Sequence, residues 1–242
     1  MTNVKGKWAL VTGGARGIGA LVADFMAQKG CNLIIQSRNE EHNKAICEKV
    51  SKYGIETKSV ACDLGKPESV TEMLQKIDAM GVKVELVFNN AAVQIAYRTE
   101  YFTTPVSDFE QSFYINTIAP AMICYHFMPK MIEAGFGRII NTTSGIDKEP
   151  QQAGYSASKA ALDKFTRDLG TVVEGTDVII SLTDPGWCRT DLGGPNAPNS
   201  PESALPGVIL GAFVDDKKSG RTFAAGAYHG LTLEEAVAKV QG

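Results

Sequence analysis

The 242-residue sequence has few cysteines, few histidines and no strong excess of charge of either sign. Its five cysteines are spread along the chain without a Cys-x-x-Cys pair, and its three histidines show no metal-ligand spacing. A disulfide framework and a metal site are therefore not expected. The net charge of −3, with lysines and arginines scattered, provides no basic patch, so we expect no nucleic-acid partner.

Long apolar segments are also missing. No segment approaches the roughly 20 apolar residues that a membrane helix requires. The first residues, MTNVKGKWALVTGG, lead directly into a strand-like run without the apolar core of a signal peptide. We therefore expect no membrane partner and a cytoplasmic location with reduced thiols. The 44% of hydrophobic residues is enough for a substantial core without crosslinks.

Short apolar runs alternate with segments of helical period. The predicted strands are 8–12, 31–37, 56–61, 84–89, 138–143 and 177–183. Between them, 39–53 and 67–80 are examples of segments with apolar residues at helical spacing, the second opening with Pro67 near a helix N-terminus. Because parallel strands need crossover helices, this alternation predicts an α/β fold with a doubly wound, Rossmann-type parallel sheet in a single domain, 1–242. Ligands of such sheets bind at the carboxyl ends of the strands.

The stretch TGGARGIG, residues 12–19, connects the first predicted strand to the first predicted helix. Gly13, Gly17 and Gly19 form a G-x-x-x-G-x-G pattern, which differs in spacing from the common G-x-G-x-x-G fingerprint. Glycines at such a turn let backbone N–H groups approach a pyrophosphate at the positive end of the helix dipole. A tight turn without a ligand would have the same glycines, so residues further along the chain must decide between the two.

Residues 36–38, Gln-Ser-Arg, end the second predicted strand, where NAD-binding proteins commonly carry an acidic residue for the ribose. No carboxylate is present there. Arg38, next to Ser37, and Arg16 in the glycine turn are suited to bind a 2′-phosphate by charge-assisted hydrogen bonds. The alternative is that both arginines are solvated surface charges. We predict that NADP(H) is preferred and that NAD(H) is the second choice.

In GYSASKAALDKF, Tyr155 and Lys159 are four residues apart, so they lie on one helix face about a turn from each other. The pKa of a free tyrosine is about 10, and a neighbouring ammonium together with an oxidised nicotinamide would favour the phenolate. Tyr155 could then exchange a proton with a carbinol oxygen. The same pair also arises by chance on ordinary helices, so its significance depends on the other motifs.

Several further motifs follow the glycine turn in a fixed order: Asn89-Asn90-Ala91, Asn116, Ser144, Tyr155 with Lys159, and Pro185-Gly186. With them, the chain from residue 7 to about 225 resembles the short-chain dehydrogenase/reductase family. The resemblance implies four catalytic residues, Asn116, Ser144, Tyr155 and Lys159. Ser144 would polarise the substrate oxygen and Tyr155 would exchange its proton. Lys159 would lower the pKa of Tyr155 and orient the nicotinamide ribose, and Asn116 would complete a proton path.

Some residues keep alternative interpretations beside the resemblance. Thr142 and Thr143 are competing hydroxyls for the role of Ser144. Asp63 fits either an adenine contact or a residue that leads into the next helix. Trp187 fits structural packing or substrate contact. The cofactor-binding residues that the resemblance implies are Gly13, Arg16, Gly17, Ile18, Gly19, Ser37, Arg38, Asp63, Leu64, Asn90, Tyr155, Lys159, Pro185, Gly186, Cys188 and Thr190.

The resemblance predicts hydride transfer between a nicotinamide cofactor and a small-molecule carbonyl or secondary alcohol. Segment 191–206 is expected to form a substrate lid, and PGWCRTDLGGPNAP is similar to carbonyl-reductase-like members. An isomerase or epimerase that uses nicotinamide transiently, and a non-catalytic NADP(H) sensor, are the alternatives. The chain lacks the Val-Asp-Gly-Gly ending of many tetrameric members. A homodimer or a homotetramer is expected.

Overall fold

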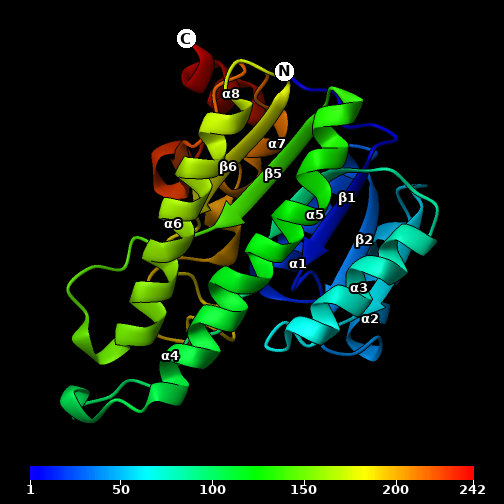
Figure 1. The fold of residues 1–242 in the computed structure, drawn as a ribbon. Coiled ribbons are helices and arrows are strands. Elements are labelled where there is room, and N and C mark those ends of the chain that lie inside the picture. The colour runs from blue at the N-terminus through cyan, green and yellow to red at the C-terminus, as the bar shows by residue number, and fades with distance from the viewer.

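The computed structural model describes residues 1–242, which form one seven-stranded parallel sheet with the strand order β3-β2-β1-β4-β5-β6-β7 (Figure 1). The strands are β1 (Trp8–Thr12), β2 (Asn32–Ser37), β3 (Thr57–Ala61), β4 (Val84–Asn89), β5 (Gly137–Thr142), β6 (Val178–Asp184) and β7 (Thr222–Ala224). The order turns back between β1 and β4, as expected for a doubly wound sheet. The predicted fold class is therefore confirmed.

Helices cover both faces of the sheet (Figure 1). They are α1 (Gly17–Gln28), α2 (Glu41–Ser51), α3 (Pro67–Ala79), α4 (Val106–Phe113), α5 (Ala119–Ala134), α6 (Ala153–Val173), α7 (Leu210–Phe213) and α8 (Leu233–Gln241). In Figure 1, α5 and α6 cross the front of the sheet, and α1 lies behind it. None of these helices is both long and apolar enough to cross a membrane.

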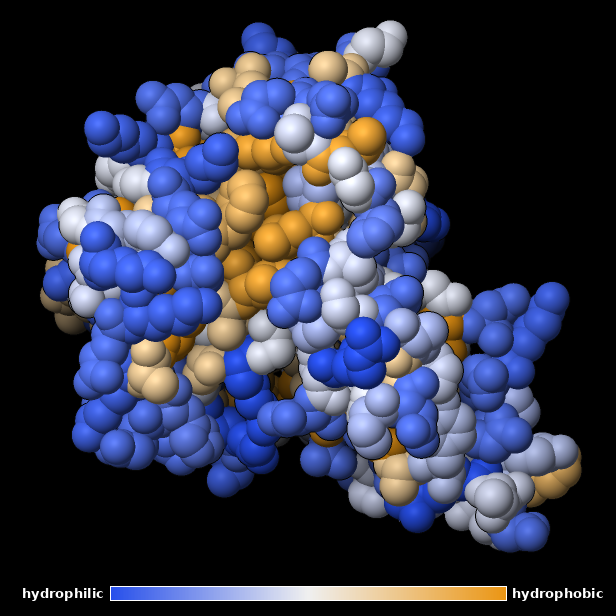
Figure 2. Space-filling view, turned by 180° about the vertical axis from the view of Figure 1, so that it is seen from behind, coloured by the Kyte–Doolittle hydropathy of each residue, from blue (hydrophilic) through white to orange (hydrophobic).

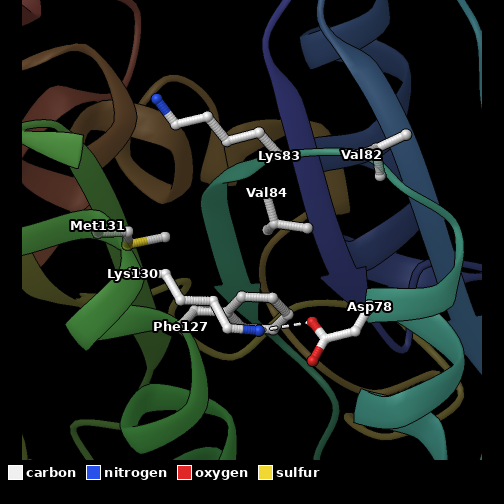
Figure 3. Close-up of a pocket in the computed structure, with 7 residues that line it drawn as sticks. All are labelled: Asp78, Val82, Lys83, Val84, Phe127, Lys130 and Met131. Carbon is white, nitrogen blue, oxygen red and sulfur yellow. Dashed lines mark hydrogen bonds and ion pairs between the residues drawn. The ribbon is translucent and has the colours of Figure 1, made fainter. Parts of the chain in front are cut away.

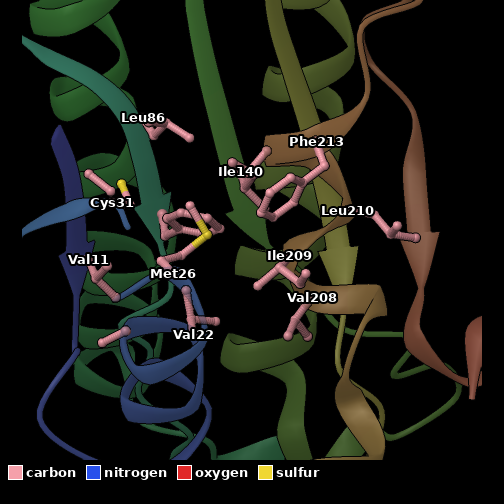
Figure 4. Packing of buried hydrophobic residues seen from close by; sticks show 14 of the residues in the cluster. Val11, Val22, Met26, Cys31, Leu86, Ile140, Val208, Ile209, Leu210 and Phe213 are labelled. Carbon is pink, nitrogen blue, oxygen red and sulfur yellow. The ribbon is translucent and has the colours of Figure 1, made fainter. Parts of the chain in front are cut away.

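Two apolar cores lie on the two faces of the sheet, and consecutive strand residues alternate between them. In β1, Ala9 and Val11 join the core formed with α1, α2, α7 and α8, whereas Trp8 and Leu10 join the core formed with α3 and α5. Figure 4 shows part of the first core, where Met26 and Val22 of α1 lie near Val11. Because both faces are buried, the strands read as continuous apolar runs in the sequence.

The strand predictions are correct to within one residue at each end, but they omit β7. This strand has only three residues, so it shows no alternation that a sequence pattern could reveal. Helices 39–53 and 67–80 were predicted correctly, although α2 is shorter than expected, starting at Glu41 and ending at Ser51.

The rear layer becomes irregular after residue 200. It consists there of short 3-10 turns, of α7, which has only four residues, and of the C-terminal α8. Seen from behind, the molecule shows apolar residues in a recess bordered by polar ones (Figure 2). The long helix α6, which carries Tyr155 and Lys159, lies on the front face instead.

Candidate active site

The predicted site residues lie after the carboxyl ends of four strands. Gly13 follows β1, Asn90 follows β4, Ser144 lies two residues after β5, and Pro185 follows β6. Because the strands are parallel, these ends share one edge of the sheet. The fold therefore gathers residues that are far apart in the sequence, at the edge where α/β sheets bind ligands.

The glycine turn has a backbone that only glycine adopts readily. Gly13 and Gly17 have φ angles of +61° and +54°. At Gly19 the limit is space, since an added Cβ would lie 2.2 Å from the carbonyl oxygen of Gly13 and 2.5 Å from Nδ2 of Asn90. Helix α1 begins at Gly17, and its N-cap Arg16 forms no side-chain capping hydrogen bond. The N–H groups of the first turn therefore suit a phosphate, and the turn fits a dinucleotide pyrophosphate.

A hydrogen-bond network joins the ends of β1 and β4 behind this turn. The hydroxyl of Thr12 accepts hydrogen bonds from the N–H groups of Asn90 (3.0 Å) and Ala91 (3.1 Å). The Asn90 side chain donates to the carbonyl oxygen of Thr12 at 3.1 Å. Asn90 thus braces the turn at a position from which it could also border the cofactor. The role of Thr12 was not predicted, because its partners are distant in the sequence.

Gln36 lies at the end of β2, where many NAD-binding proteins carry an acid. Its side chain is buried, and both of its polar atoms have hydrogen-bond partners. Its Oε1 accepts a hydrogen bond from the Gly13 N–H (3.1 Å), and its Nε2 donates to the carbonyl oxygen of Cys62 (2.9 Å). Ser37 donates to the carbonyl oxygen of Asn39 at 2.6 Å. Arg38 is exposed beside them. The end of β2 therefore carries the uncharged, hydrogen-bonded side chain of Gln36 and the exposed guanidinium of Arg38.

Arg16 forms an ion pair with Asp191 at 2.6 Å, and both side chains are about two-thirds exposed (67% and 69%). An added Cβ at Gly17 would lie 3.4 Å from Cγ2 of Thr190, so Thr190, directly before the predicted lid, and Asp191, its first residue, both lie against the glycine turn. The ion pair is exposed and therefore weak, and a phosphate could replace Asp191 as the partner of Arg16.

Asp63 has local partners in this structure. Its Oδ1 accepts a hydrogen bond from the Gly65 N–H at 3.1 Å, and its Oδ2 lies 3.5 Å from the ammonium of Lys66. These contacts match the interpretation of Asp63 as a residue that leads into α3. Leu64 is buried in the core. The adenine contact implied for both residues stays a prediction.

Tyr155 and Lys159 lie on the first turns of α6, and both are buried. The ammonium of Lys159 donates a hydrogen bond to the carbonyl oxygen of Thr142 at 2.7 Å and lies 5.9 Å from the centroid of the Tyr155 ring. Burial lowers the pKa of Lys159 to about 8, although the carboxylates of Asp163 and Asp184 oppose the change. Near neutral pH the side chain is thus still mostly charged.

The pKa of Tyr155 is raised, chiefly by burial, and the charge of Asp184 adds to the increase. The nearby Ser144 hydroxyl opposes it. The expected lowering of the Tyr155 pKa by Lys159 together with an oxidised nicotinamide stays a prediction. The phenol is protonated at neutral pH, as a proton donor must be.

Ser144 is the hydroxyl that interacts with the Tyr155 phenol and opposes the rise of its pKa. Its Oγ accepts a hydrogen bond from the Ile146 N–H at 3.2 Å. The competing hydroxyl of Thr143 donates instead to the carboxylate of Asp163. The local hydrogen bonds thus leave Ser144, rather than Thr143, next to the phenol.

Asn116 lies in a π-helical turn, Tyr114–Ile118, between α4 and α5. Its Oδ1 accepts from the Val93 N–H (2.9 Å), and its Nδ2 donates to the Val93 carbonyl (2.9 Å) and to the Ser158 hydroxyl (3.0 Å). The side chain therefore links the loop after β4 to the helix of Tyr155. Such π turns are frequent at functional sites, but no sequence signal marked this one. The proton path through Asn116 stays a prediction.

The Pro185-Gly186 loop closes the site on the side of β6. Gly186 has a φ of +73°, and its N–H donates to Asp184 Oδ1 at 2.9 Å.

Cys188 follows this loop and is buried. Burial raises the pKa of its thiol, so reaction with a thiol reagent is disfavoured. Thr190 accepts a hydrogen bond from the Gly193 N–H at 3.1 Å, and the half-exposed Trp187 donates to the Gly193 carbonyl at 2.7 Å.

A separate small pocket lies near the amino end of β4, between α3 and α5 (Figure 3). Phe127 and Met131 of α5 line it together with Val84, and Lys130 contacts Asp78 at 2.6 Å at its rim. None of the predicted site residues lines this pocket. It is therefore distinct from the site at the carboxyl edge.

Comparisons with known proteins agree with this geometry. The family model described as short chain dehydrogenase matches residues 7–200. The 3-oxoacyl-(acyl-carrier-protein) reductase of Aquifex aeolicus is 30% identical over 194 residues, covering 78% of this chain and 77% of the relative. The enzyme of that name from Chlamydia muridarum is 31% identical over 210 residues, covering 85% and 83%.

Solved structures have the same fold. A metagenomic short-chain oxidoreductase in complex with NADP is 28% identical, with a TM-score of 0.71 over 76% of this chain and 84% of the other. A short chain dehydrogenase/reductase family protein is 27% identical, with a TM-score of 0.79 over 94% and 99%. This chain therefore belongs to the short-chain dehydrogenase family of NAD(P)-dependent oxidoreductases, which act on alcohol or carbonyl groups.

Proposed function

We propose that this protein transfers a hydride between NADP(H) and a small-molecule carbonyl or secondary alcohol, with Tyr155 as the acid and base. The observation that carries the proposal is the position of Tyr155, buried and protonated at neutral pH beside Ser144 and Lys159. When bound, the nicotinamide would supply or accept the hydride. In the direction of reduction, the phenol of Tyr155 would give its proton to the substrate oxygen.

The neighbouring side chains then have distinct tasks. Ser144 would donate a hydrogen bond to the carbonyl oxygen and stabilise the negative charge that develops there. Lys159, anchored on the carbonyl of Thr142, would orient the nicotinamide ribose and favour the phenolate after proton transfer. Asn116 would hold the loop after β4 through its two hydrogen bonds to Val93. Pro185, Gly186, Cys188 and Thr190 would border the nicotinamide.

A preference for NADP(H) follows from the charges at the end of β2. Gln36 brings no negative charge and is already engaged with Gly13 and Cys62. Arg38 is exposed, and Arg16 has only the weak partner Asp191 to give up. A 2′-phosphate would thus meet two guanidinium groups and no adjacent acid from β2. The relative solved with NADP is consistent with this proposal.

The test follows the absorbance of NADPH and of NADH with native protein and with Tyr155→Phe, over aldehydes, diketones, steroids and keto-sugars. We expect faster oxidation of NADPH by the native protein, and a variant that binds NADPH but reduces its substrate at least about 1000-fold more slowly. Equal rates in both proteins would refute the role of Tyr155. Binding without net oxidation of NADPH would indicate the sensor, and product formation without net oxidation would indicate the isomerase.

The setting of this activity is also part of the proposal. All five cysteines are free, which suits the reducing cytoplasm. The segment 191–206, whose start contacts the glycine turn, would act as a substrate lid within the single domain 1–242. Exposed apolar side chains on α5 and α6 would support a homodimer or homotetramer.

A further inference from the structure

The segment between β4 and α4, residues 90–105, is irregular apart from one 3-10 turn, yet it is held at several points. Val93 is bound on both sides by Asn116. The carbonyl oxygen of Ile95 accepts a hydrogen bond from the buried Gln152 side chain at 2.9 Å, and the Arg98 N–H donates to the carbonyl oxygen of Gln151 at 3.1 Å. The segment is thus fastened to the turn that leads into the helix of Tyr155.

The remaining anchor is an ion pair between Arg98 and Asp108. Nε of Arg98 lies 2.7 Å from Oδ2, and one terminal nitrogen lies 3.0 Å from Oδ1. The Asp108 side chain is only 9% exposed, whereas that of Arg98 is 40% exposed. Two parallel hydrogen bonds to a mostly buried carboxylate define one geometry, which a single flexible surface contact would not.

Asp108 also contacts the helix of Tyr155 through its backbone. An added Cβ at Gly154 would lie 2.8 Å from the carbonyl oxygen of Asp108. Gly154 immediately precedes Tyr155 in the sequence. The ion pair therefore joins segment 90–105 to the part of α4 that is packed directly against the start of α6.

The residue next to Arg98 is Tyr97, whose side chain is 58% exposed. On either side of it, Ile95 and Arg98 are hydrogen-bonded to Gln152 and Gln151, which lie three and four residues before Tyr155, so this part of the segment lies beside the start of α6. An exposed tyrosine at this place offers an aromatic face and a hydroxyl close to the start of the helix that carries Tyr155. Neither Arg98 nor Tyr97 takes part in the chemistry proposed above.

We propose that Arg98 is a positioning residue, which through Asp108 fixes segment 90–105 so that Tyr97 forms one wall of the substrate site beside Tyr155. This inference rests on the proposed function and deepens it. The favoured substrates are carbonyl compounds with an aromatic or similarly large apolar group next to the reacting carbonyl. Such a group would pack on the Tyr97 ring, whereas a small ketone would gain little from it.

The first experiment measures hydrogen exchange of segment 90–105 in the native protein and in Arg98→Met. Loss of the ion pair should speed exchange in this segment about tenfold, with melting temperature and NADPH binding nearly unchanged. Lys164→Met, which removes the exposed Lys164–Asp168 pair elsewhere on α6, should leave the segment as in the native protein. Unchanged exchange in Arg98→Met would overturn the positioning role.

The second experiment compares 1-phenyl-1,2-propanedione with 2,3-butanedione as substrates for NADPH-dependent reduction. Arg98→Met and Tyr97→Ala should each raise the KM for the phenyl compound about tenfold, leave kcat within about threefold and hardly affect butanedione. Tyr97→Phe should keep the native KM. A fall in kcat for both diones alike would mean that the residues act only on general structure and would overturn the inference.

The two proposals fail separately. If the native protein oxidises NADPH with neither dione nor any other carbonyl of the panel, the proposed function fails, and the assignment of Tyr97 as a substrate wall fails with it. The exchange measurement does not depend on turnover, so it still accepts or rejects the role of Arg98.

Discussion

At the scale of single residues, the site depends on two groups whose pKa values are shifted by burial. The ammonium of Lys159 is held inside the protein by one carbonyl oxygen, and its pKa falls from 10.5 to about 8. The pKa of Tyr155 is raised instead, which likewise favours the neutral form. In both residues burial disfavours the charged form, so a reaction that moves a proton between substrate and Tyr155 starts from a protonated donor.

The buried ammonium should be visible in the pH dependence of stability. Between pH 8 and 10.5 the unfolded chain keeps a proton on Lys159 that the folded chain releases, so the free energy of unfolding rises with pH. The total is about 3 kcal/mol at 1.36 kcal/mol per pKa unit. Urea unfolding of native protein and Lys159→Met from pH 7 to 11 measures it. We expect the native protein to gain this amount relative to the variant, and parallel curves would contradict the shift.

Close packing at Gly19 gives a second test at this scale. In Gly19→Ala the new methyl group would lie 2.2 Å from the Gly13 carbonyl oxygen. The glycine turn must therefore open, and its backbone N–H groups would no longer be placed to bind a pyrophosphate. We expect NADPH affinity to fall at least about tenfold and the melting temperature to drop by several degrees. Gly226→Ala is the matched control because nothing lies within 4 Å of its added Cβ. Equal behaviour of the two variants would show that the turn does not need glycine.

At the scale of elements, pieces of the chain that are far apart are joined by a few polar side chains. Asn116 ties the loop after β4 to α6, and Asn90 ties the end of β4 to β1. Asn89 of β4 donates to the side chain of Asn141 on β5 at 2.8 Å. Such buried amides must find partners, so they define how neighbouring strands and helices fit together.

Arg138 of β5 is the largest of these links and lies near the amino end of its strand, away from the site. Its buried guanidinium donates to the carbonyl oxygen of Val214 (3.1 Å), the hydroxyl of Thr2 (3.0 Å) and the carboxylate of Asp177 (2.6 Å). Arg138→Met should lower the free energy of unfolding by roughly 3–5 kcal/mol. Denaturant titration measures this, with Lys164→Met as the exposed control.

The same variant should keep its active site at low temperature, because none of these partners belongs to it. We therefore expect kcat of Arg138→Met to stay within about twofold of the native value at temperatures where the variant is folded. A stable but inactive variant would show that β5 transmits a distortion to its carboxyl end.

At the scale of the whole molecule, one exposed apolar face stands out. Ile118, Tyr125 and Ile132 are exposed on or directly before α5 at a spacing of seven residues, which places them on one helix face. Val172 is exposed on the neighbouring α6, and the Tyr125 ring meets Phe165 of that helix edge-on at 5.5 Å. Exposed apolar side chains gathered on neighbouring helices commonly mark an interface.

Self-association through α5 and α6 predicts a mass of a dimer or a tetramer by size-exclusion chromatography with light scattering. Tyr125→Glu should shift the population to the monomer, because a charge would be buried at the interface. Phe102→Glu changes a more exposed aromatic residue away from these helices and should leave the mass unchanged. A native monomer at micromolar concentration would refute the prediction.

The amino-acid sequence by itself determined the fold class, six of the seven strands, the glycine turn and the pairing of Tyr155 with Lys159 on one helix face. These features depend on periodicity and turn chemistry that act over a few neighbouring residues. They also account for the family, because its motifs are short and appear in a fixed order.

Only the tertiary structure decided which partners the site residues have. The occupied side chain of Gln36, the bond from Lys159 to Thr142 and the pair of Arg98 with Asp108 join residues between 10 and 26 positions apart. The raised pKa of Tyr155 likewise reflects burial among side chains from several elements. Local sequence patterns do not predict such contacts, because the burial of a side chain and its distance from other residues are set only when the sheet and its helices pack together.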